Sequence, residues 1–360
     1  MTTQHRPTAA AAVVGLVAVL TACSSGAEPG AGGSPDASAS GTVTLVTHDS
    51  FAASDEVLAA FEDQTGIVVE QVAPGDAGTL VNQLVLTKDA PLGDVVFGVD
   101  NTFASRAVEA GVLEPYTPAD LDASARQYAT GAYDVAGALT PVDVGDVCIN
   151  VDTQWFAEED IPQPATLEDL TDPRYADLTV VTNPATSSPG LAFLLATVGA
   201  FGEDGWTGYW ERLRDNGVKV ADSWEDAYYV DFSGAGEGGE RPIALSYSTS
   251  PAFTVSEDGS ESRTAALLET CYRQVEYAGV LAGTDNPEGA RALVDFLTSA
   301  EFQAGIPEQM YMYPADATVE LPADWKAFAP LAPEPFTVAP DDVAAHRDDW
   351  IQQWTDTVVG

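Results

Sequence analysis

The sequence has few basic residues and no hydrophobic run long enough to span a bilayer. Only 14 lysines and arginines stand against 56 aspartates and glutamates among 360 residues, which gives a net charge of −42. Such a balance speaks against nucleic acid as a partner, because its phosphates require lysine and arginine. The charge favours a cationic or neutral partner, and an adaptation of the surface to solubility or high salt is the alternative explanation for it.

The chain also lacks the motifs of common catalytic and metal sites. Its histidines, His5, His48 and His346, are scattered, and no cluster of cysteine and histidine has zinc spacing. The nucleophile pattern Gly-x-Ser-x-Gly is absent. The stretch GAGEGGE, residues 234–240, fits Gly-x-Gly-x-x-Gly but precedes a strand instead of linking a strand to a helix, so we interpret it as a loop. We therefore expect no enzyme, no metal and no cofactor.

The N-terminus carries an export signal. An apolar run from Ala9 to Leu20 follows Arg6 and has the length of a signal-peptide core, which is too short for a stable membrane anchor. The next residues, LTAC, resemble the lipobox of bacterial lipoproteins, in which cleavage leaves a lipidated cysteine, here Cys23. We expect residues 1–22 to be removed and the protein to be held on the outer face of the cytoplasmic membrane. A plain signal peptide with a coincidental cysteine is the alternative.

The rest of the chain predicts a tethered α/β protein. Residues 23–41 are rich in Ser, Gly, Ala and Pro and form a flexible tether. After them, strand-like and helix-like segments alternate, which favours a mostly parallel sheet with right-handed crossovers and two lobes. Ser54 and Gly66 are the expected start and stop of the first helix, and residues 287–306 are expected to form one or two helices.

Two stretches suggest a binding cleft between such lobes. In ALSYSTSPAF, residues 244–253, an apolar run ends in hydroxyl groups and one aromatic ring, as expected for a cleft wall at a strand's end, although an ordinary polar turn fits as well. In NPATSSPG, Ser187 or Ser188 can cap the helix that begins near Pro189, and Gly190 can let a ligand approach the helix N-terminus. Simple capping is the alternative.

Four segments together resemble the thiamine-binding proteins of bacterial ABC importers. They are VTHDSFAA (residues 46–53), DVVFGVDN (94–101), TSSPGLAFLL (186–195) and LSYSTSPAF (245–253), with SWEDAYY and MYMYP at the expected places. The resemblance covers residues 42–354. It implies the two-lobed periplasmic-binding-protein fold of type II with a hinge, and a monomer that captures thiamine or its phosphate esters by cleft closure and delivers it to an ABC permease.

The resemblance also implies the residues of the cleft. It places carboxylates and polar groups beside a cationic ligand at Asp49, Ser50, Asp100 and Asn101. Aromatic walls are implied at Trp224, Tyr247 with Ser248, and Tyr311. The hydroxyethyl or phosphate end of the ligand is expected at Ser187, Ser188 and Gly190. A receptor of the same fold for a polyamine or ferric iron, and a secreted enzyme acting on thiamine esters, are the alternatives.

The same fold predicts the lobes and a disulfide. We expect residues 42–147 with 276–360 to form the first lobe and residues 148–275 the second. An even pair of cysteines in an exported protein suggests a disulfide, and two buried thiols are the alternative. Cys148 and Cys271 lie in the apparent crossing segments, which run side by side in this fold, so we expect them to be bonded across the hinge.

Overall fold

The computed structural model describes residues 41–131, 134, 136–235 and 238–360. The expected signal peptide, Cys23 and all of the tether except Gly41 lie outside the described residues. In the part of the chain that is described, no helix is long and apolar enough to cross a membrane.

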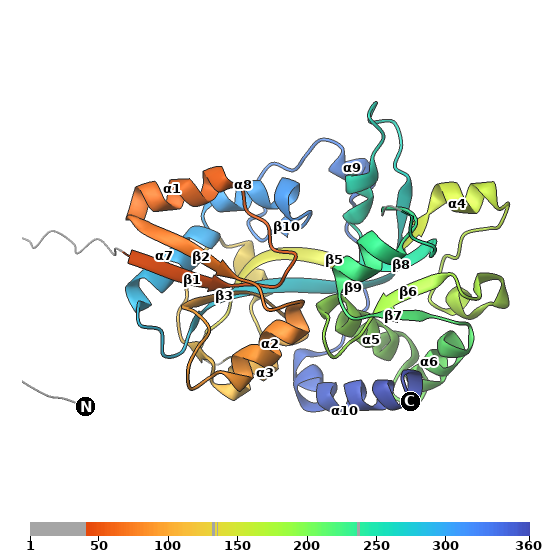
Figure 1. The fold of residues 1–360 in the computed structure, drawn as a ribbon, viewed down its shortest axis with the longest axis horizontal. Coiled ribbons are helices and arrows are strands. Elements are labelled where there is room, and N and C mark those ends of the chain that lie inside the picture. The colour runs from red at the N-terminus through yellow and green to blue at the C-terminus, as the bar shows by residue number, and fades with distance from the viewer. Residues whose placement is uncertain (1–40, 132–133, 135, 236–237) are drawn as a thin grey trace, which may run out of the picture. The chain divides into compact units, whose positions relative to one another are not determined.

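The strands among the described residues form one sheet (Figure 1). Its order is β2-β1-β3-β9-β5-β8-β6-β7, while β4 pairs with β9 and β10 pairs with β5. The strands are β1 (Gly41–Val46), β2 (Ile67–Val72), β3 (Val95–Asp100), β4 (Leu113–Glu114), β5 (Thr140–Asp152), β6 (Thr179–Thr182), β7 (Lys219–Ala221), β8 (Ile243–Tyr247), β9 (Thr264–Leu281) and β10 (Tyr313–Pro314).

The expectation of a mostly parallel sheet is correct only at its two ends. β1 is parallel to β2 and β3, and β6 is parallel to β7 and β8. The two long central strands differ, because β9 is antiparallel to β3 and β5, and β5 is antiparallel to β8. The reason is that each parallel end is built from strand, helix and strand units, whereas β5 and β9 run between the two ends and return beside each other.

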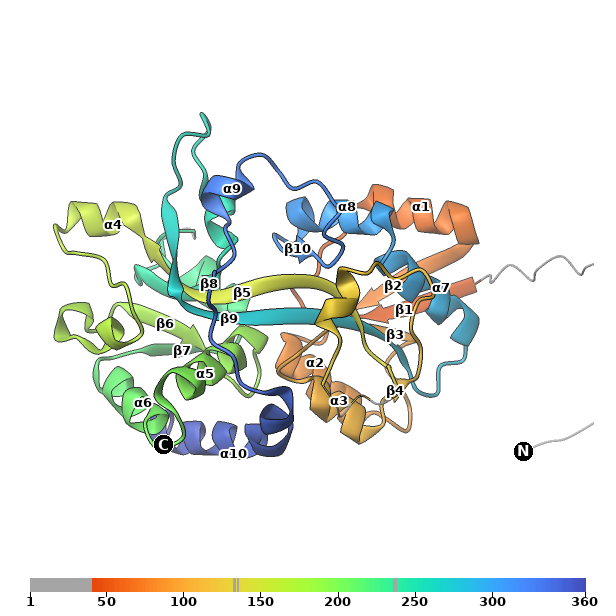
Figure 2. The same cartoon turned by 180° about the vertical axis from the view of Figure 1, so that it is seen from behind.

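Helices cover both faces of this sheet (Figure 2). They are α1 (Asp55–Thr65), α2 (Ala77–Leu86), α3 (Ala104–Ala110), α4 (Thr153–Glu158), α5 (Ser188–Phe201), α6 (Trp206–Asp215), α7 (Pro287–Leu297), α8 (Ala300–Gln309), α9 (Trp325–Phe328) and α10 (Pro340–Val358). Short helical turns are η1 (Ala125–Tyr128), η2 (Glu168–Thr171), η3 (Pro173–Tyr175), η4 (Asp226–Asp231) and η5 (Ser250–Thr254).

Several helix ends follow directly from the sequence. The Ser54 side chain accepts a hydrogen bond from the backbone of Val57, and Gly66 ends α1 in the left-handed region with φ of 73°. The segment 287–306 contains two helices, because Ser299 caps the second by accepting from the backbone of Phe302. Both expectations are confirmed.

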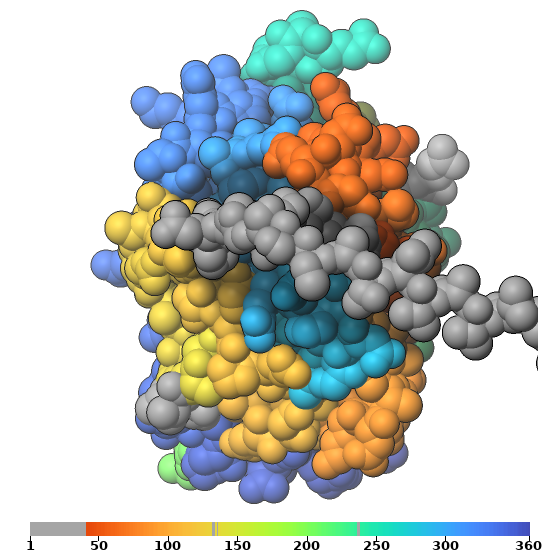
Figure 3. Space-filling model, turned by 90° about the vertical axis from the view of Figure 1, so that its left-hand side faces the viewer, coloured from red at the N-terminus to blue at the C-terminus, as the bar shows by residue number. Residues whose placement is uncertain are grey.

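The N-terminal end of the sheet is built from segments far apart in the sequence. Figure 3 shows that α1, in orange, and the blue segments of α7 and α8 form parts of the same surface. The rings of Phe61 in α1 and Phe296 in α7 lie 5.0 Å apart. This end therefore buries its apolar side chains between segments that lie far apart in the sequence.

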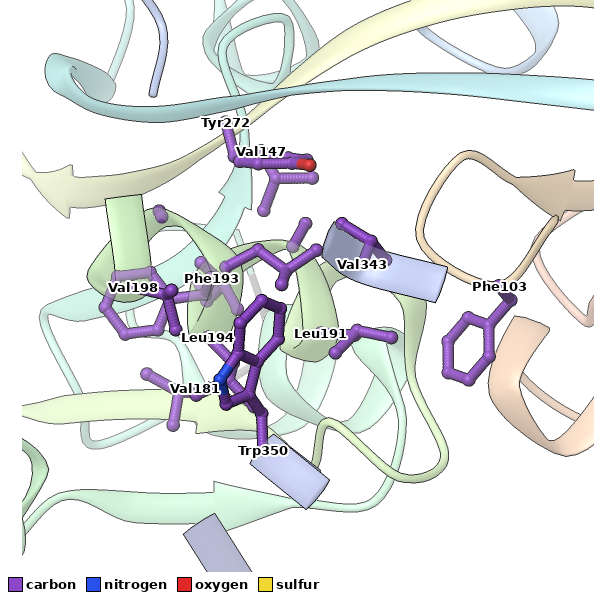
Figure 4. Close-up of a cluster of buried hydrophobic side chains, with 14 of the residues drawn as sticks. Phe103, Val147, Val181, Leu191, Phe193, Leu194, Val198, Tyr272, Val343 and Trp350 are labelled. Atoms are coloured by element: carbon purple, nitrogen blue, oxygen red, sulfur yellow. The ribbon is translucent and has the colours of Figure 1, made fainter. Parts of the chain in front are cut away.

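The C-terminal helix packs against the other end of the sheet. The rings of Trp354 in α10 and Trp210 in α6 lie 5.5 Å apart and edge to face, and Arg214 donates to the carbonyl of Thr357 at 2.7 Å. Val343 and Trp350 of α10 join the cluster around α5 (Figure 4). We therefore propose that α10 belongs with residues 148–275, which changes the expected lobe of residues 276–360 at its last helix.

The disulfide lies where the long strands cross the middle of the sheet. Cys148 of β5 is bonded to Cys271 of β9, and the two strands shift register at this point. Beside the bond, the buried carboxylate of Asp146 accepts from Arg273 at 3.0 Å and from the backbone of Ala332 at 2.6 Å. These contacts hold the segment around Ala332, which leads into α10, against the centre of β5 and β9.

Candidate ligand-binding site

A cavity of about 230 Å³ lies where both ends of the sheet contribute side chains. Its wall includes six aromatic and three acidic side chains, and among the described residues no lysine or arginine lines it. The aromatic residues of the wall are Trp224, Tyr228, Tyr229, Tyr247, Phe253 and Tyr311, the acidic residues are Asp76, Glu225 and Glu276, and the one histidine is His48.

The expected aromatic walls are all present in this cavity. Trp224 stacks on Tyr228 with ring centroids 5.1 Å apart and lies 6.2 Å from Tyr247 at a steep angle. Its indole N–H donates to the hydroxyl of Ser246 at 2.9 Å, which fixes the ring. Tyr311 has a φ of 54°, an uncommon backbone conformation for a residue with a side chain, and its ring meets Phe253 edge to face at 5.2 Å.

The stretch after β8 forms one wall of the cavity, as its composition suggested. Tyr247, Thr249 and Ser250 all line the cavity. The Ser250 hydroxyl lies 2.7 Å from that of Ser246 and accepts from the backbone N–H of Tyr247 at 3.2 Å. The hydroxyl groups therefore hold the turn into η5 and leave the Tyr247 ring at the cavity.

Asp76 is a central residue that the sequence analysis did not identify. Its carboxylate accepts from the backbone N–H groups of Ala77 at 2.6 Å, Trp224 at 3.0 Å and Ser188 at 3.4 Å. Burial raises its pKa, and the hydrogen bonds from the backbone oppose that rise. One side chain thus connects the beginnings of α2 and α5 with the segment of Trp224. The available signal was an aspartate in the N-cap position of a helix after Pro and Gly.

At the N-terminus of α5, the expected roles of Ser187, Ser188 and Gly190 are met only in part. Neither serine caps the helix with its side chain, and the hydroxyl of Ser187 instead donates to Thr182 at 3.0 Å. A side chain at Gly190 would come within 2.6 Å of the Thr182 carbonyl, so this glycine allows α5 to pack tightly on β6. It does not open the path for a ligand that the sequence suggested. Ser188 alone of these three residues lines the cavity.

The structure does not bring Asp100 or Asn101 to the cavity wall. Asp100 is fully buried and accepts from the Thr102 hydroxyl at 2.9 Å and the Phe103 backbone at 3.1 Å, which turns it toward α3. Burial raises its pKa to about 6. The Asn101 side chain donates to the carbonyl of Arg273 at 3.1 Å and accepts from the backbone of Val275 at 3.0 Å, so it joins β3 to β9.

Of the remaining expected residues, one lines the cavity and two do not. Ser50 lies in the wall, whereas Asp49 and Ser248 are absent from it. Asp49 is half-buried and its backbone donates to Gly75 at 3.1 Å. Ser248 is fully buried and its backbone donates to Asp146 at 2.8 Å. The carboxylates at the cavity are therefore Asp76, Glu225 and Glu276 in place of Asp49 and Asp100.

In the described part of the chain, no group of three or more histidine, cysteine, aspartate or glutamate residues is placed to hold a metal ion.

Known proteins resemble this chain over most of its length. Residues 90–331 match the family described as bacterial extracellular solute-binding protein. The thiamine-binding periplasmic protein of Escherichia coli (strain K12) is 32% identical over 323 residues, which are 87% of this chain and 92% of that protein. The thiamine-binding periplasmic protein of Brucella suis biovar 1 is 30% identical over 328 residues, which are 89% and 93%.

Solved structures share the fold. A periplasmic thiamin binding protein superposes with a TM-score of 0.75 at 29% identity and covers 88% of this chain and 96% of its own. The iron-bound HitA protein of Pseudomonas aeruginosa gives a TM-score of 0.67 at 22% identity, over 87% of this chain and 99% of its own. The predicted periplasmic-binding-protein fold is confirmed.

These relatives also decide between a binding protein and an enzyme. The matched family is one of exported solute receptors, so the chain binds a solute and does not catalyse a reaction. The chain belongs to the family of bacterial extracellular solute-binding proteins.

Proposed function

We propose that this protein is an extracytoplasmic receptor that captures thiamine and delivers it to an ABC permease. The observation that carries the proposal is the cavity wall, which combines six aromatic side chains with three carboxyl groups. A thiazolium is a permanent cation in a flat aromatic ring, so it gains from aromatic faces and from negative charge nearby. The names of the relatives point to the same ligand.

The positions of the side chains suggest how the ligand lies. Trp224, Tyr247 and Tyr311 enclose the rings, and Glu276 and Asp76 face the positive charge. The hydroxyl of Ser188, at the start of α5, receives the hydroxyethyl end of the ligand. Each cation–π contact is worth about 0.5–2 kcal/mol, so two or three of them suffice for a clear preference for the cation.

Capture follows from the placement of the cavity between the two ends of the sheet. His48 and Asp76 come from the end that holds β1 and β3, and Trp224 comes from the end that holds β6 and β8. A ligand that touches both ends stabilises the conformation in which they are close, and the permease recognises that conformation.

Lipidation of Cys23 completes the proposal. The anchor holds a monomeric receptor at the outer face of the cytoplasmic membrane, on the tether of residues 23–41. Two or more acyl chains provide stable attachment, since each buried methylene adds about 0.8 kcal/mol.

Native mass spectrometry of the protein as purified tests the ligand directly. We expect a species heavier than the apoprotein by the mass of thiamine, and loss of that mass after denaturation and refolding. A titration of the refolded protein with thiamine should restore it, and Tyr116→Ala, which changes a tyrosine that does not line the cavity, should bind as the wild type does. Failure of the refolded protein to bind thiamine, with its fold intact by circular dichroism, would refute the proposal.

A further inference from the structure

His48 occupies an unusual position in the cavity wall. Its side chain is 12% exposed, and its Nε2 lies 3.4 Å from Oε1 of Glu276. That nitrogen is buried and is not aligned for a hydrogen bond with any of the described residues. A buried ring nitrogen without a hydrogen bond at the edge of a cavity is costly unless it serves a ligand or carries charge.

The backbone of β3 fixes the imidazole in this place. A side chain at Gly98 would lie 2.2 Å from Cδ2 of His48, so the ring lies directly against the strand, and Gly98 has a φ of +95°. The ring of Phe97 lies 5.7 Å away on the same strand. The absence of a side chain at Gly98 therefore leaves the space beside β3 that the imidazole occupies.

The charged groups that interact with His48 are carboxylates. Glu276 reaches it from β9, Asp76 from the N-terminus of α2, and Asp49 is its neighbour in the chain. Glu225, ahead of η4, also interacts with it through the cavity. Burial lowers the pKa of His48, but these carboxylates outweigh that effect, so its pKa stands above the ordinary value.

A second buried acid lies behind Glu276. Asp143 of β5 pairs across the strands with Glu276, is fully buried, and makes no well-aligned hydrogen bond with the described residues through either oxygen. Burial raises the pKa of Asp143 well above its ordinary value, and the neighbouring charge of Glu276 adds to the rise. Asp143 and Glu276 therefore form a buried pair of acids beside His48. Gln274 also donates to Glu276 at 3.3 Å.

We propose that His48 holds a proton in the empty receptor and releases it when thiamine binds. The inference rests on the proposed function, because it requires a cationic ligand. The imidazolium supplies the positive charge that Glu276 needs in the empty cavity. A thiazolium that enters beside it supplies the same charge, and two cations in one small cavity repel each other. The proton goes to the buffer, and the neutral Nε2 then accepts a hydrogen bond from the ligand.

The release has a definite consequence for the pH dependence of binding. A cation that displaces a proton binds more tightly as the pH rises through the pKa of His48 in the empty receptor. Between that pKa and the lower pKa in the complex, the Kd for thiamine should fall by up to about tenfold per pH unit. Above both values the affinity should be constant.

Calorimetric titration with thiamine in buffers of different ionisation enthalpy, at one pH near neutrality, measures the proton directly. We expect the wild type to release protons, up to one per thiamine bound, by the linkage of binding to titration. His48→Gln should bind thiamine and release almost none. The matched control is His346→Gln, which replaces an exposed histidine of α10 that does not line the cavity, and it should release as much as the wild type.

The outcomes separate this inference from the proposed function. If thiamine binds to the wild type without proton release, or if His48→Gln releases as much as the wild type, the inference is wrong and the receptor function stands. If no thiamine binds to the folded wild type, the proposed function is wrong. If His48→Gln fails to fold, nuclear magnetic resonance of the wild-type His48 imidazole provides the test. The ring should be charged without thiamine and neutral with it. A ring that is neutral in both states would overturn the inference.

Discussion

Replacing Asp100 with asparagine should remove a large part of the pH dependence of stability. Asp100 is fully buried beside the start of α3, and its pKa is raised from 3.8 to about 6. A carboxyl whose pKa is raised by folding stabilises the protein fully below pH about 4, and that contribution is lost as the pH rises through about 6. About two pKa units correspond to roughly 3 kcal/mol, and little screening reduces this figure because solvent does not reach the group.

Urea denaturation of the wild type and of Asp100→Asn, each at pH 4 and pH 7.5, measures this contribution. The change in the free energy of unfolding between the two pH values should differ between the proteins by about 2.5 kcal/mol, with the wild type losing more at the higher pH. Comparing differences cancels any constant effect of the amide on the hydrogen bonds from Thr102 and Phe103. As a control, Asp341→Asn, which changes an exposed residue in the first turn of α10, should follow the wild type. Equal pH dependence in the wild type and Asp100→Asn would refute the reasoning.

Three further predictions concern the disulfide, the anchor and the cavity. Labelling of free thiols in the unreduced, denatured mature protein should find neither Cys148 nor Cys271, and two labelled thiols would disprove the bond in solution. The double variant Cys148→Ser, Cys271→Ser should lose up to about 5 kcal/mol of stability in urea denaturation, because the bond closes a loop of 123 residues. Cys23→Ser should release the protein to the medium or leave it unprocessed, and wild-type protein that is wholly soluble and has no lipid mass would contradict the anchor. Tyr247→Ala should weaken thiamine binding by at least about tenfold in calorimetry with nearly unchanged thermal stability of the empty protein; unfolding without a change in affinity would assign Tyr247 to the core.

The local structure could be predicted where a short segment contains its own signals. Ser54 and Gly66 bound α1 because an N-cap and a left-handed glycine act within one turn. Three of the six aromatic residues of the cavity could be named, because the resemblance placed Trp224, Tyr247 and Tyr311 in recognisable motifs. Tyr228, Tyr229 and Phe253 were not predicted. The central antiparallel strands could not be predicted from periodicity, which reports that a strand is buried and not which way its neighbours run.

The acidic residues of the site were harder to predict because they are brought together by tertiary structure. Asp76 joins residues more than a hundred positions away, and no pattern near it announces those partners. Glu276 offered one local signal for a functional role, because it is a carboxylate within an otherwise apolar part of a strand. Asp100 showed the opposite behaviour: the resemblance implied it as a carboxylate beside the ligand, but nearby N–H and O–H groups of Thr102 and Phe103 bind it instead.

The central claim is that the cavity recognises a cation, and calorimetry with a matched pair of ligands tests it most directly. The pair is thiamine and an analogue in which a neutral thiophene replaces the thiazolium, both titrated into the refolded wild type. We expect the neutral analogue to bind at least about tenfold more weakly, a difference of about 1.4 kcal/mol that one partly desolvated cation–π contact can supply. Equal affinity for the two ligands would contradict the account.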